Sequence, residues 1–251
     1  MSTTVPSERP RILLWDVETS PLVVTTWGLF KPHLSHDNIQ QESLVICAAW
    51  KWLGQEEVGS VGVNPARPKN DRRVITTLHR VLQEADVLVA HNGDKFDLRK
   101  FNARAIYYGM DPLRDIPTID TLKVARRVAS FNSNRLDYLG KFLCGVGKIK
   151  TDYDLWLRVM DGDQVALDQM MEYNRGDIIV LEKVYNRLRP YMKKHPNASL
   201  YREEHCCPTC GSTNLQKRGF KFQQTTRREA YQCKDCGAWS SGKFMGRAEV
   251  G

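Results

Sequence analysis

The sequence contains no long apolar run, and this absence excludes a membrane-spanning helix, which requires about 20 consecutive apolar residues. Its first ten residues are polar and lack the apolar centre of a signal peptide, so we expect a cytoplasmic protein. No internal repeat and no low-complexity tract interrupts the chain. Because thiols stay reduced in the cytoplasm, the seven cysteines are not expected to form disulfides.

The composition is that of a globular protein with an excess of positive charge. The 251 residues are 41% hydrophobic and 26% charged, which argues against a disordered chain or a coiled coil. This length accommodates one domain of about 150 to 200 residues and a small appendage. The formal net charge of +8 favours polyanionic partners such as nucleic acid. Charge alone does not decide the partner, because many basic proteins bind nucleic acid only incidentally.

Apolar patterning predicts a first domain in which strands come before alternating helices and strands. Short apolar runs predict strands at residues 11–16, 43–50, 57–63 and 86–90. Apolar residues at helical spacing predict helices at 71–84, 97–108 and 163–188. We also expect a brief extended stretch at 116–119, followed by further helices through Cys144. This order predicts an α/β fold, a mixed sheet flanked by helices. Because prolines bracket a basic segment after the last helix, we expect a domain at 1–192, a linker at 193–205 and a second domain at 206–251.

Two acids stand at the end of the first predicted strand. Asp16 and Glu18 are two residues apart, so both side chains point to the same face of the strand. A solvated strand end is the structural alternative. Two like charges where a buried strand emerges repel each other unless a cation compensates them, which favours a metal site.

Two further segments carry acids at places where a fold would present them. Asp97 follows the strand at 86–90 and begins a helix, so it could bind a metal or serve as the N-cap of that helix. Asp94 is a competing acid in the same loop, and capping by one acid does not exclude metal binding by the other. Tyr173 and Asp177 are four residues apart on the long helix, which puts them on one face, although the tyrosine could simply pack and the acid be solvated. Gly176 costs that helix about 1 kcal/mol relative to alanine, so we expect another group to approach its backbone closely.

Four acids in one semi-buried site would require cations. Asp16, Glu18, Asp97 and Asp177 could not all stay ionised together without neutralisation, and hard oxygen ligands select Mg²⁺ or Mn²⁺. Two such ions about 4 Å apart could clamp a scissile phosphate, one activating water and the other stabilising the departing 3′ oxygen. The expected product is a nucleoside 5′-monophosphate.

The three motifs, taken in order, resemble those of the DEDD exonuclease superfamily in its tyrosine variant. The resemblance implies a ribonuclease H-like fold, two divalent cations held by the four acids, and a Tyr173 that orients the attacking water. The histidine variant has its histidine at the position where Glu172 stands here. Residues 16–21, 91–97 and 134–140, together with the cysteine-rich tail, also resemble stand-alone exonuclease-like proteins of bacteriophages and prophages, which implies a location in the host cytoplasm.

Several neighbouring residues have both a structural and a functional interpretation. Asp120 follows the extended stretch and could lie beside the metals, but capping of the next helix is favoured. His91 could contact a phosphate or be a satisfied structural histidine. Residues 137–139 are expected to pack a helix against the sheet, and Trp50 and Trp52 to lie in the core.

The C-terminal region predicts a structural zinc site. Two C-x-x-C-G segments, separated by 22 residues, supply Cys207, Cys210, Cys233 and Cys236, and four thiolates at such spacing bind one tetrahedral Zn²⁺. Cys206 could compete with Cys207, but only Cys207 gives the two-residue gap. The remaining thiols, Cys47 and Cys144, are expected to be ordinary buried cysteines.

The segment between the two cysteine pairs is basic and aromatic. It carries Lys217, Arg218, Lys221, Arg227 and Arg228, interleaved with Phe220, Phe222 and Tyr231. Aromatic rings among cations suit a single strand of nucleic acid, whose bases stack while its phosphates are neutralised. The alternatives are that the aromatics form the core of the zinc ribbon, or that the ribbon binds a protein.

These observations together favour an enzyme, a free-standing 3′-to-5′ exonuclease that uses two Mg²⁺ or Mn²⁺ ions and prefers single-stranded ends of DNA. An exoribonuclease and a structure-selective endonuclease on the same fold remain alternatives. A different class of function is a catalytically inactive protein that binds nucleic acid or recruits a partner. We expect no membrane partner.

Overall fold

A five-stranded mixed sheet forms the centre of the protein. The computed structural model describes residues 9–30, 34–149, 151–202 and 204–247. The strand order is β5-β4-β1-β6-β7, in which β1 pairs antiparallel with β4 and parallel with β6. These strands span Ile12–Thr19 (β1), Val45–Trp52 (β4), Val58–Gly62 (β5), Val87–Ala90 (β6) and Thr118–Asp120 (β7). The central position of β1 places its two acids in the middle of the domain.

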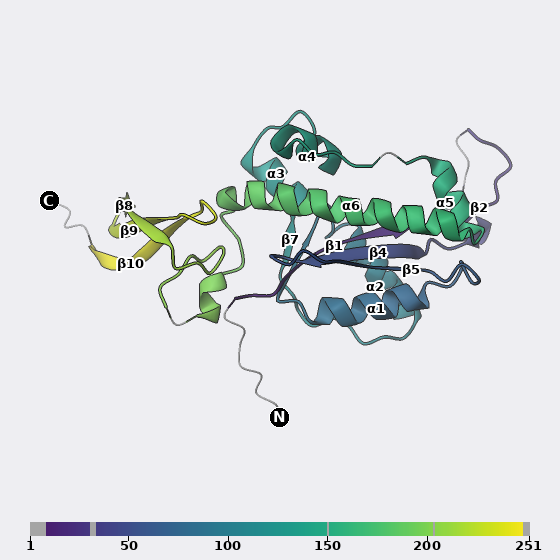
Figure 1. Ribbon diagram of the computed structural model, residues 1–251, viewed down its shortest axis with the longest axis horizontal. Coiled ribbons are helices and arrows are strands. Elements are labelled where there is room, and N and C mark those ends of the chain that lie inside the picture. Colours follow the sequence, from purple (N-terminus) through teal and green to yellow (C-terminus); the bar gives the residue numbers. More distant parts are fainter. Residues whose placement is uncertain (1–8, 31–33, 150, 203, 248–251) are drawn as a thin grey trace, which may run out of the picture.

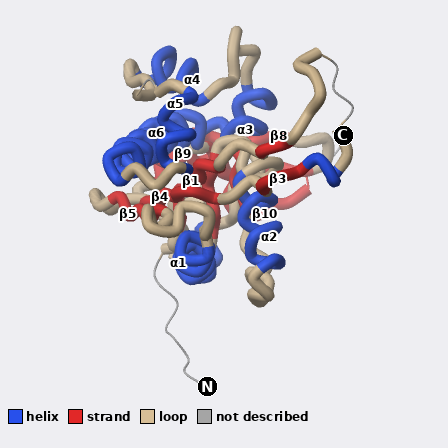
Figure 2. The backbone as a smooth tube through the Cα atoms, turned by 90° about the vertical axis from the view of Figure 1, so that its right-hand side faces the viewer, coloured by secondary structure: helices blue, strands red, loops and turns tan. Residues whose placement is uncertain are grey.

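Helices cover both faces of this sheet. Figures 1 and 2 show α6, with α3, α4 and α5, on one side of the strands, and α1 and α2 on the other. The helices span Arg72–Gln83 (α1), Asp97–Tyr107 (α2), Thr121–Val128 (α3), Leu136–Cys144 (α4), Tyr153–Met160 (α5) and Gln164–Leu188 (α6). In the described part of the chain, none of them combines the length and the apolar character needed to cross a bilayer.

The alternation of side chains along β1 decides which face the acids occupy. Leu13 and Trp15 pack with α1 and α2 in one core cluster, whereas Ile12 and Leu14 pack with α6 in the other. Because successive side chains of a strand point to opposite faces, Asp16 continues the row of Ile12 and Leu14. The strand therefore presents its acids toward the long helix.

The predicted α/β fold is confirmed, and the segments that the sequence analysis omitted are short. The helix predicted at 163–188 is α6, and the strand predicted at 57–63 is β5. The prediction did not include β2 (Val23–Val24), β3 (Ile39–Gln41) or α5. Both Trp50 and Trp52 pack partly buried against the core, as expected.

A small antiparallel sheet follows α6. Its strands are β8 (Leu215–Phe222), β9 (Thr226–Cys233) and β10 (Trp239–Arg247), in the order β10-β9-β8. Figure 1 shows this sheet beyond the C-terminal end of α6, away from the main domain. Within the region expected to be a linker, Ala198–Tyr201 forms a short 3-10 helix and Ala198 is buried.

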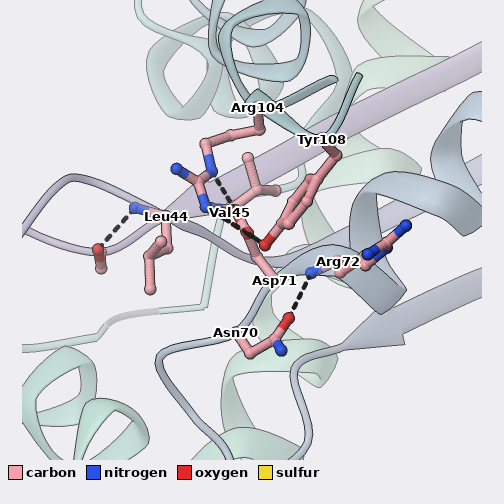
Figure 3. Close-up of polar contacts among 8 residues, drawn as sticks. Leu44, Val45, Asn70, Asp71, Arg72, Arg104 and Tyr108 are labelled. Carbon is pink, nitrogen blue, oxygen red and sulfur yellow. Dashed lines mark hydrogen bonds and ion pairs between the residues drawn. The ribbon is translucent and has the colours of Figure 1, made fainter. Parts of the chain in front are cut away.

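One buried ion pair joins three elements of the main domain (Figure 3). The Asp71 carboxylate, which precedes α1, accepts two hydrogen bonds from the Arg104 guanidinium, at 2.8 Å each. It also accepts bonds from the backbone N–H of Val45, at 3.0 Å, and from the Tyr108 hydroxyl, at 2.6 Å. Asp71 therefore links the start of β4 to α1 and to α2, the helix that begins with Asp97.

Breaking this pair should destabilise the domain strongly. We expect Arg104→Met to lower the free energy of unfolding by about 3 kcal/mol, because it leaves a buried carboxylate without its cation. Urea unfolding followed by circular dichroism measures the loss. The control is Glu84→Ala, which breaks an exposed pair with Arg11 and should cost less than about 1 kcal/mol. Equal losses in the two variants would contradict the structural role of Asp71.

Candidate functional site

Three of the four predicted acids meet between β1 and α6. Asp16 and Glu18 on β1 and Asp177 on α6 each offer an oxygen, and these oxygens lie within 4.8 Å of one another. The long helix runs along the face of β1 that carries the two acids, so its inward side brings Asp177 to them. Residues that are about 160 positions apart in the sequence are thus close enough to share a cation.

The fourth acid, Asp97, lies beside this cluster rather than within it. It is the first residue of α2 and follows the N-cap position, Phe96, so it is not the N-cap of that helix. Instead, its buried Oδ1 accepts the backbone N–H of Val17, at 3.1 Å, which fixes it against β1 between the two strand acids. Its charge is also the largest electrostatic contribution that raises the pKa of Asp16, after burial itself.

A fully buried asparagine holds Asp16. The Nδ2 of Asn174 donates a 2.7 Å hydrogen bond to Oδ2 of Asp16, and its own Oδ1 lies 4.0 Å from the Cys47 thiol. Asn174 was not predicted from the sequence. The available signal was its position next to Tyr173, because a polar residue on the buried side of a long helix needs a partner.

A lysine that was not predicted from the sequence also reaches the acids. Lys148 lies between α4 and α5, and its ammonium group forms an ion pair with Asp177 and lies 3.5 Å from the Tyr173 hydroxyl. The Asp137 carboxylate accepts the backbone N–H of Lys148, at 2.9 Å, which ties this segment to α4. Asp137 therefore positions Lys148, while its neighbour Leu139 packs in the core as expected.

Ile149, the residue after Lys148, accounts for the presence of Gly176 in α6. A Cβ added to Gly176 would lie 3.4 Å from Cδ1 of Ile149, so the group that approaches this backbone is an isoleucine. The ring of Tyr173 in turn packs edge to face against Trp156 of α5, with centroids 6.2 Å apart. The loop and α5 together set the position of the tyrosine over the acids.

Burial and mutual repulsion raise the pKa of every acid in the cluster. Burial is the main reason that the pKa of Asp16 lies well above its ordinary value. The negative charges of Asp97, Glu18 and Asp177 raise it further. The pKa of Glu18 rises to about 8 and that of Asp97 to about 6, in both cases mainly through burial. Burial also raises the pKa of Asp177 although Lys148 opposes it. The cluster thus lacks positive charge.

This donor set fits divalent cations. Oδ1 of Asp177 is buried and has no hydrogen-bond partner among the described residues, so one oxygen is available to a ligand. Oxygen donors of this kind are those that Mg²⁺ and Mn²⁺ prefer. Burial raises the pKa of the Tyr173 phenol to about 12, so the hydroxyl keeps its proton at neutral pH.

Other residues near the acids have structural partners. Asp120 caps α3 by accepting the backbone N–H groups of Leu122 and Lys123. His91 bonds Thr121 and the carbonyl of Asn134 through its two ring nitrogens, at 2.9 Å each, and burial lowers its pKa. Asp94 forms an ion pair with Lys123, at 2.6 Å.

The four cysteines of the C-terminal region converge as a zinc site requires. Their sulfur atoms lie within 4.8 Å of one another, with Cys207 3.7 Å from Cys236 and Cys210 3.6 Å from Cys233. Four sulfurs bound to one zinc at about 2.3 Å would be about 3.8 Å apart, which matches these separations. Cys206 is buried and does not belong to the cluster.

The basic residues predicted to bind nucleic acid lie on β8 and β9. The side chains of Lys217, Arg218, Lys221, Arg227 and Arg228 are exposed. One of them, Lys217, is paired with Glu229, and Arg227 lies 4.6 Å over the ring of Phe220. Asp177 precedes the C-terminal residue of α6 by eleven positions, about 16 Å along the helix, and the ribbon lies beyond that end.

Sequence comparison decides the family. A family model described as the RNase_H superfamily matches residues 37–189, more than half of the chain. The chain belongs to the RNase_H superfamily. The expected ribonuclease H-like fold is thereby confirmed, and fold and family are those of ribonuclease H-like nucleases. The matched segment contains Asp97, Tyr173 and Asp177 but begins after β1, so the tyrosine-variant assignment stays a prediction.

Two proteins that this chain resembles are named as DNA polymerases. The chain is 32% identical over 116 residues to DNA polymerase III PolC-type of Ureaplasma parvum serovar 3, a match that covers 43% of this chain and 8% of that protein. The family B DNA polymerase of the archaeon Pyrobaculum calidifontis superposes with a TM-score of 0.56 at 16% identity, over 72% of this chain and 25% of the polymerase. The second likeness concerns the fold alone, and both matches span a minor part of the polymerase.

The pKa shifts predict a pH dependence of both stability and metal binding. The ordinary pKa of Glu18 is 4.5, and its pKa in the folded protein is about 8. Between these two pH values, the folded protein without divalent cations therefore keeps a proton that the unfolded chain has released. Its stability should therefore fall as pH rises through this window. Mn²⁺ competes with those protons, so its apparent affinity should rise by up to about tenfold per pH unit toward pH 8.

Thermal unfolding and calorimetry with Mn²⁺, in buffers freed of divalent cations beforehand and without a chelator, measure the two effects. The control is Glu18→Gln, which removes a titrating group and should flatten both pH profiles. Profiles that are already flat in the unsubstituted protein would contradict the raised pKa of Glu18.

Proposed function

We propose that this RNase_H superfamily protein is a metal-dependent 3′-to-5′ exonuclease that acts on single-stranded ends of DNA and releases nucleoside 5′-monophosphates. The observation that carries the proposal is the cluster of Asp16, Glu18 and Asp177, whose oxygens lie within 4.8 Å of one another. The hydroxyl of Tyr173 lies one helical turn from Asp177, on the same face of α6.

In this proposal the acids hold two Mg²⁺ or Mn²⁺ ions, with Asp16, Glu18 and Asp177 as the nearest set and Asp97 beside them. Such ions activate water and stabilise the charge that develops on the departing 3′ oxygen. The raised pKa values of the acids support this role, because a cation relieves the repulsion that burial imposes. Asn174 fixes one oxygen of Asp16 and so restricts the direction of the other.

Tyr173 and Lys148 would act on the water and on the phosphate. The neutral phenol can accept a hydrogen bond from an attacking water and donate one to a phosphate oxygen. The Lys148 ammonium, next to Asp177 and Tyr173, is placed to pair with a substrate phosphate once cations neutralise the acids. Trp156 holds the ring of the tyrosine in place.

The comparisons support a nuclease, and the printed name of one relative, DNA polymerase III PolC-type, favours DNA over RNA as the substrate. We further propose one structural Zn²⁺ on Cys207, Cys210, Cys233 and Cys236 of a ribbon at 206–251. The exposed cations of β8 and β9 would bind a distant part of the strand. Recruitment of a protein by the ribbon is the alternative for that region.

Removal of a metal ligand should abolish activity. We expect Asp16→Asn and Asp177→Asn each to lower nuclease activity at least about a hundredfold, because each takes a charge from the proposed cation site. The matched control is Asp154→Asn, an exposed acid on α5, which should keep activity. The assay digests 3′- and 5′-labelled single strands of DNA and RNA with Mg²⁺, with Mn²⁺ and without either.

The products distinguish the candidate functions. Mononucleotides released from the 3′ end of DNA support the proposal, and short oligomers would instead indicate an endonuclease. Faster digestion of the matched RNA would indicate an exoribonuclease. Purified protein that binds the oligonucleotides and cleaves none of them under any of these conditions would indicate the binding class.

Loss of Lys148 should separate phosphate binding from metal binding. We expect Lys148→Met to lower kcat/KM at least about tenfold, because a cation next to the scissile phosphate is lost. Its affinity for Mn²⁺, measured by calorimetry, should not fall, because the ammonium that competes for Asp177 is gone. Lys148→Arg should restore part of the activity, and Lys183→Met, at an exposed lysine of α6, should have no effect. A parallel loss of Mn²⁺ affinity in Lys148→Met would show that the lysine holds the site together instead.

A further inference from the structure

The segment between β1 and β4 exposes a group of large apolar side chains. Trp27, Leu29 and Phe30 have relative exposures of 104%, 88% and 93%, within four consecutive residues. Soluble proteins rarely gather fully exposed aromatic and aliphatic side chains in this way unless the surface binds something. We call Trp27, Leu29 and Phe30 the apolar tip.

The base of this segment is pinned at the end of β1. The backbone N–H of Ser20 donates to the carbonyl of Leu44, at 2.8 Å, and the backbone N–H of Leu44 donates back to Oγ of Ser20, at 2.9 Å. The short strands β2 and β3 then pair and close the neck, with Val23 opposite Gln41. Because Ser20 follows Glu18 by two residues, the segment leaves the sheet at the acidic cluster.

The apolar tip is therefore within reach of the candidate site. Trp27 follows Glu18 by nine positions, and a fully extended chain of that length spans at most about 30 Å. Figure 1 shows β2 and the segment that follows it projecting from the end of the sheet opposite to the zinc ribbon. A nucleic-acid strand of several nucleotides could touch both the acids and the tip.

The charges of the segment indicate which part of a strand it would contact. In the sequence, this segment has two acids, Asp37 and Glu42, and a single lysine, Lys31, so its formal charge is negative. A segment with this charge balance attracts phosphates only weakly. Exposed Trp and Phe rings do bind the faces of unpaired bases, and this stacking tolerates any sequence. Bases within a duplex are already stacked on each other and would not be available.

We propose that Trp27 and Phe30 form a stacking surface for unpaired bases of the strand whose end enters the acidic cluster. This inference rests on the proposed nuclease function and adds the reason for a single-stranded substrate. The acids would act on the terminal phosphodiester, while the apolar tip holds bases further along the same strand.

The test compares a substrate that reaches the tip with one that does not. Thymidine 5′-monophosphate p-nitrophenyl ester offers a phosphodiester without a strand, and a single-stranded oligodeoxynucleotide longer than about 30 Å reaches from Glu18 to Trp27. We expect Trp27→Ala/Phe30→Ala to raise KM for the oligodeoxynucleotide at least about tenfold, through the loss of stacking, and to leave hydrolysis of the ester unchanged.

Three further variants make the outcome decisive. Trp27→Phe/Phe30→Tyr keeps aromatic faces and should restore the low KM, and Ile106→Ala, at a residue of α2 that is 76% exposed, should change nothing. Asp16→Asn should lose both activities. If Asp16→Asn loses neither, the proposed function fails, whatever the tip does.

Two results would overturn the stacking surface itself. One is an unchanged KM for the oligodeoxynucleotide in Trp27→Ala/Phe30→Ala, which would leave a protein partner as the occupant of the tip. The other is an equal loss on both substrates, which would mean that the double substitution disturbs the acidic cluster. Fluorescence anisotropy with a labelled oligodeoxynucleotide, in an Asp16→Asn background, measures the affinity change apart from catalysis, and an unchanged affinity would also refute the proposal.

Discussion

The mutual repulsion of buried carboxylates is the constraint on which this structure depends. Asp16, Glu18 and Asp177 lie close together between β1 and α6, and burial makes each charge more costly beside the others. The protein compensates only in part, through the ammonium of Lys148 and the amide of Asn174. In our proposal, the remaining deficit of positive charge is what draws divalent cations to the cluster.

The rest of the main domain holds these groups together against that repulsion. The apolar row of β1 fastens the strand to α6, since Ile12 and Leu14 pack on the same face from which Asp16 emerges. On the other face, the buried pair of Asp71 and Arg104 ties α2 to β4 and so steadies the helix that begins with Asp97. Packing energy from both faces therefore stabilises an arrangement of charges that would not form by itself.

The proposed contacts with nucleic acid divide along the long axis of the molecule. Figure 1 places the C-terminal ribbon of β8, β9 and β10 and the strand β2 at opposite ends, with α6 between them. The ribbon presents exposed cations, which suit phosphates, and the apolar tip presents aromatic rings, which suit bases. In our proposal the two ends therefore bind different parts of the substrate, and the acids act between them.

The sequence by itself determined whatever depends on local spacing. The step of two residues from Asp16 to Glu18, the step of four from Tyr173 to Asp177, and the paired cysteines were sufficient to predict shared faces and converging thiols. The period of apolar residues likewise predicted α6 almost to the residue.

Only the tertiary structure decided which residues that are distant in sequence meet at the acids. Lys148 reaches Asp177 because Asp137 holds its loop, and Asp97 bonds the backbone of β1 where capping of α2 was the local alternative. No periodicity encodes such contacts, because they depend on how separate elements pack. For the same reason the exposure of Trp27, a residue type that is usually buried, became evident only in the folded chain.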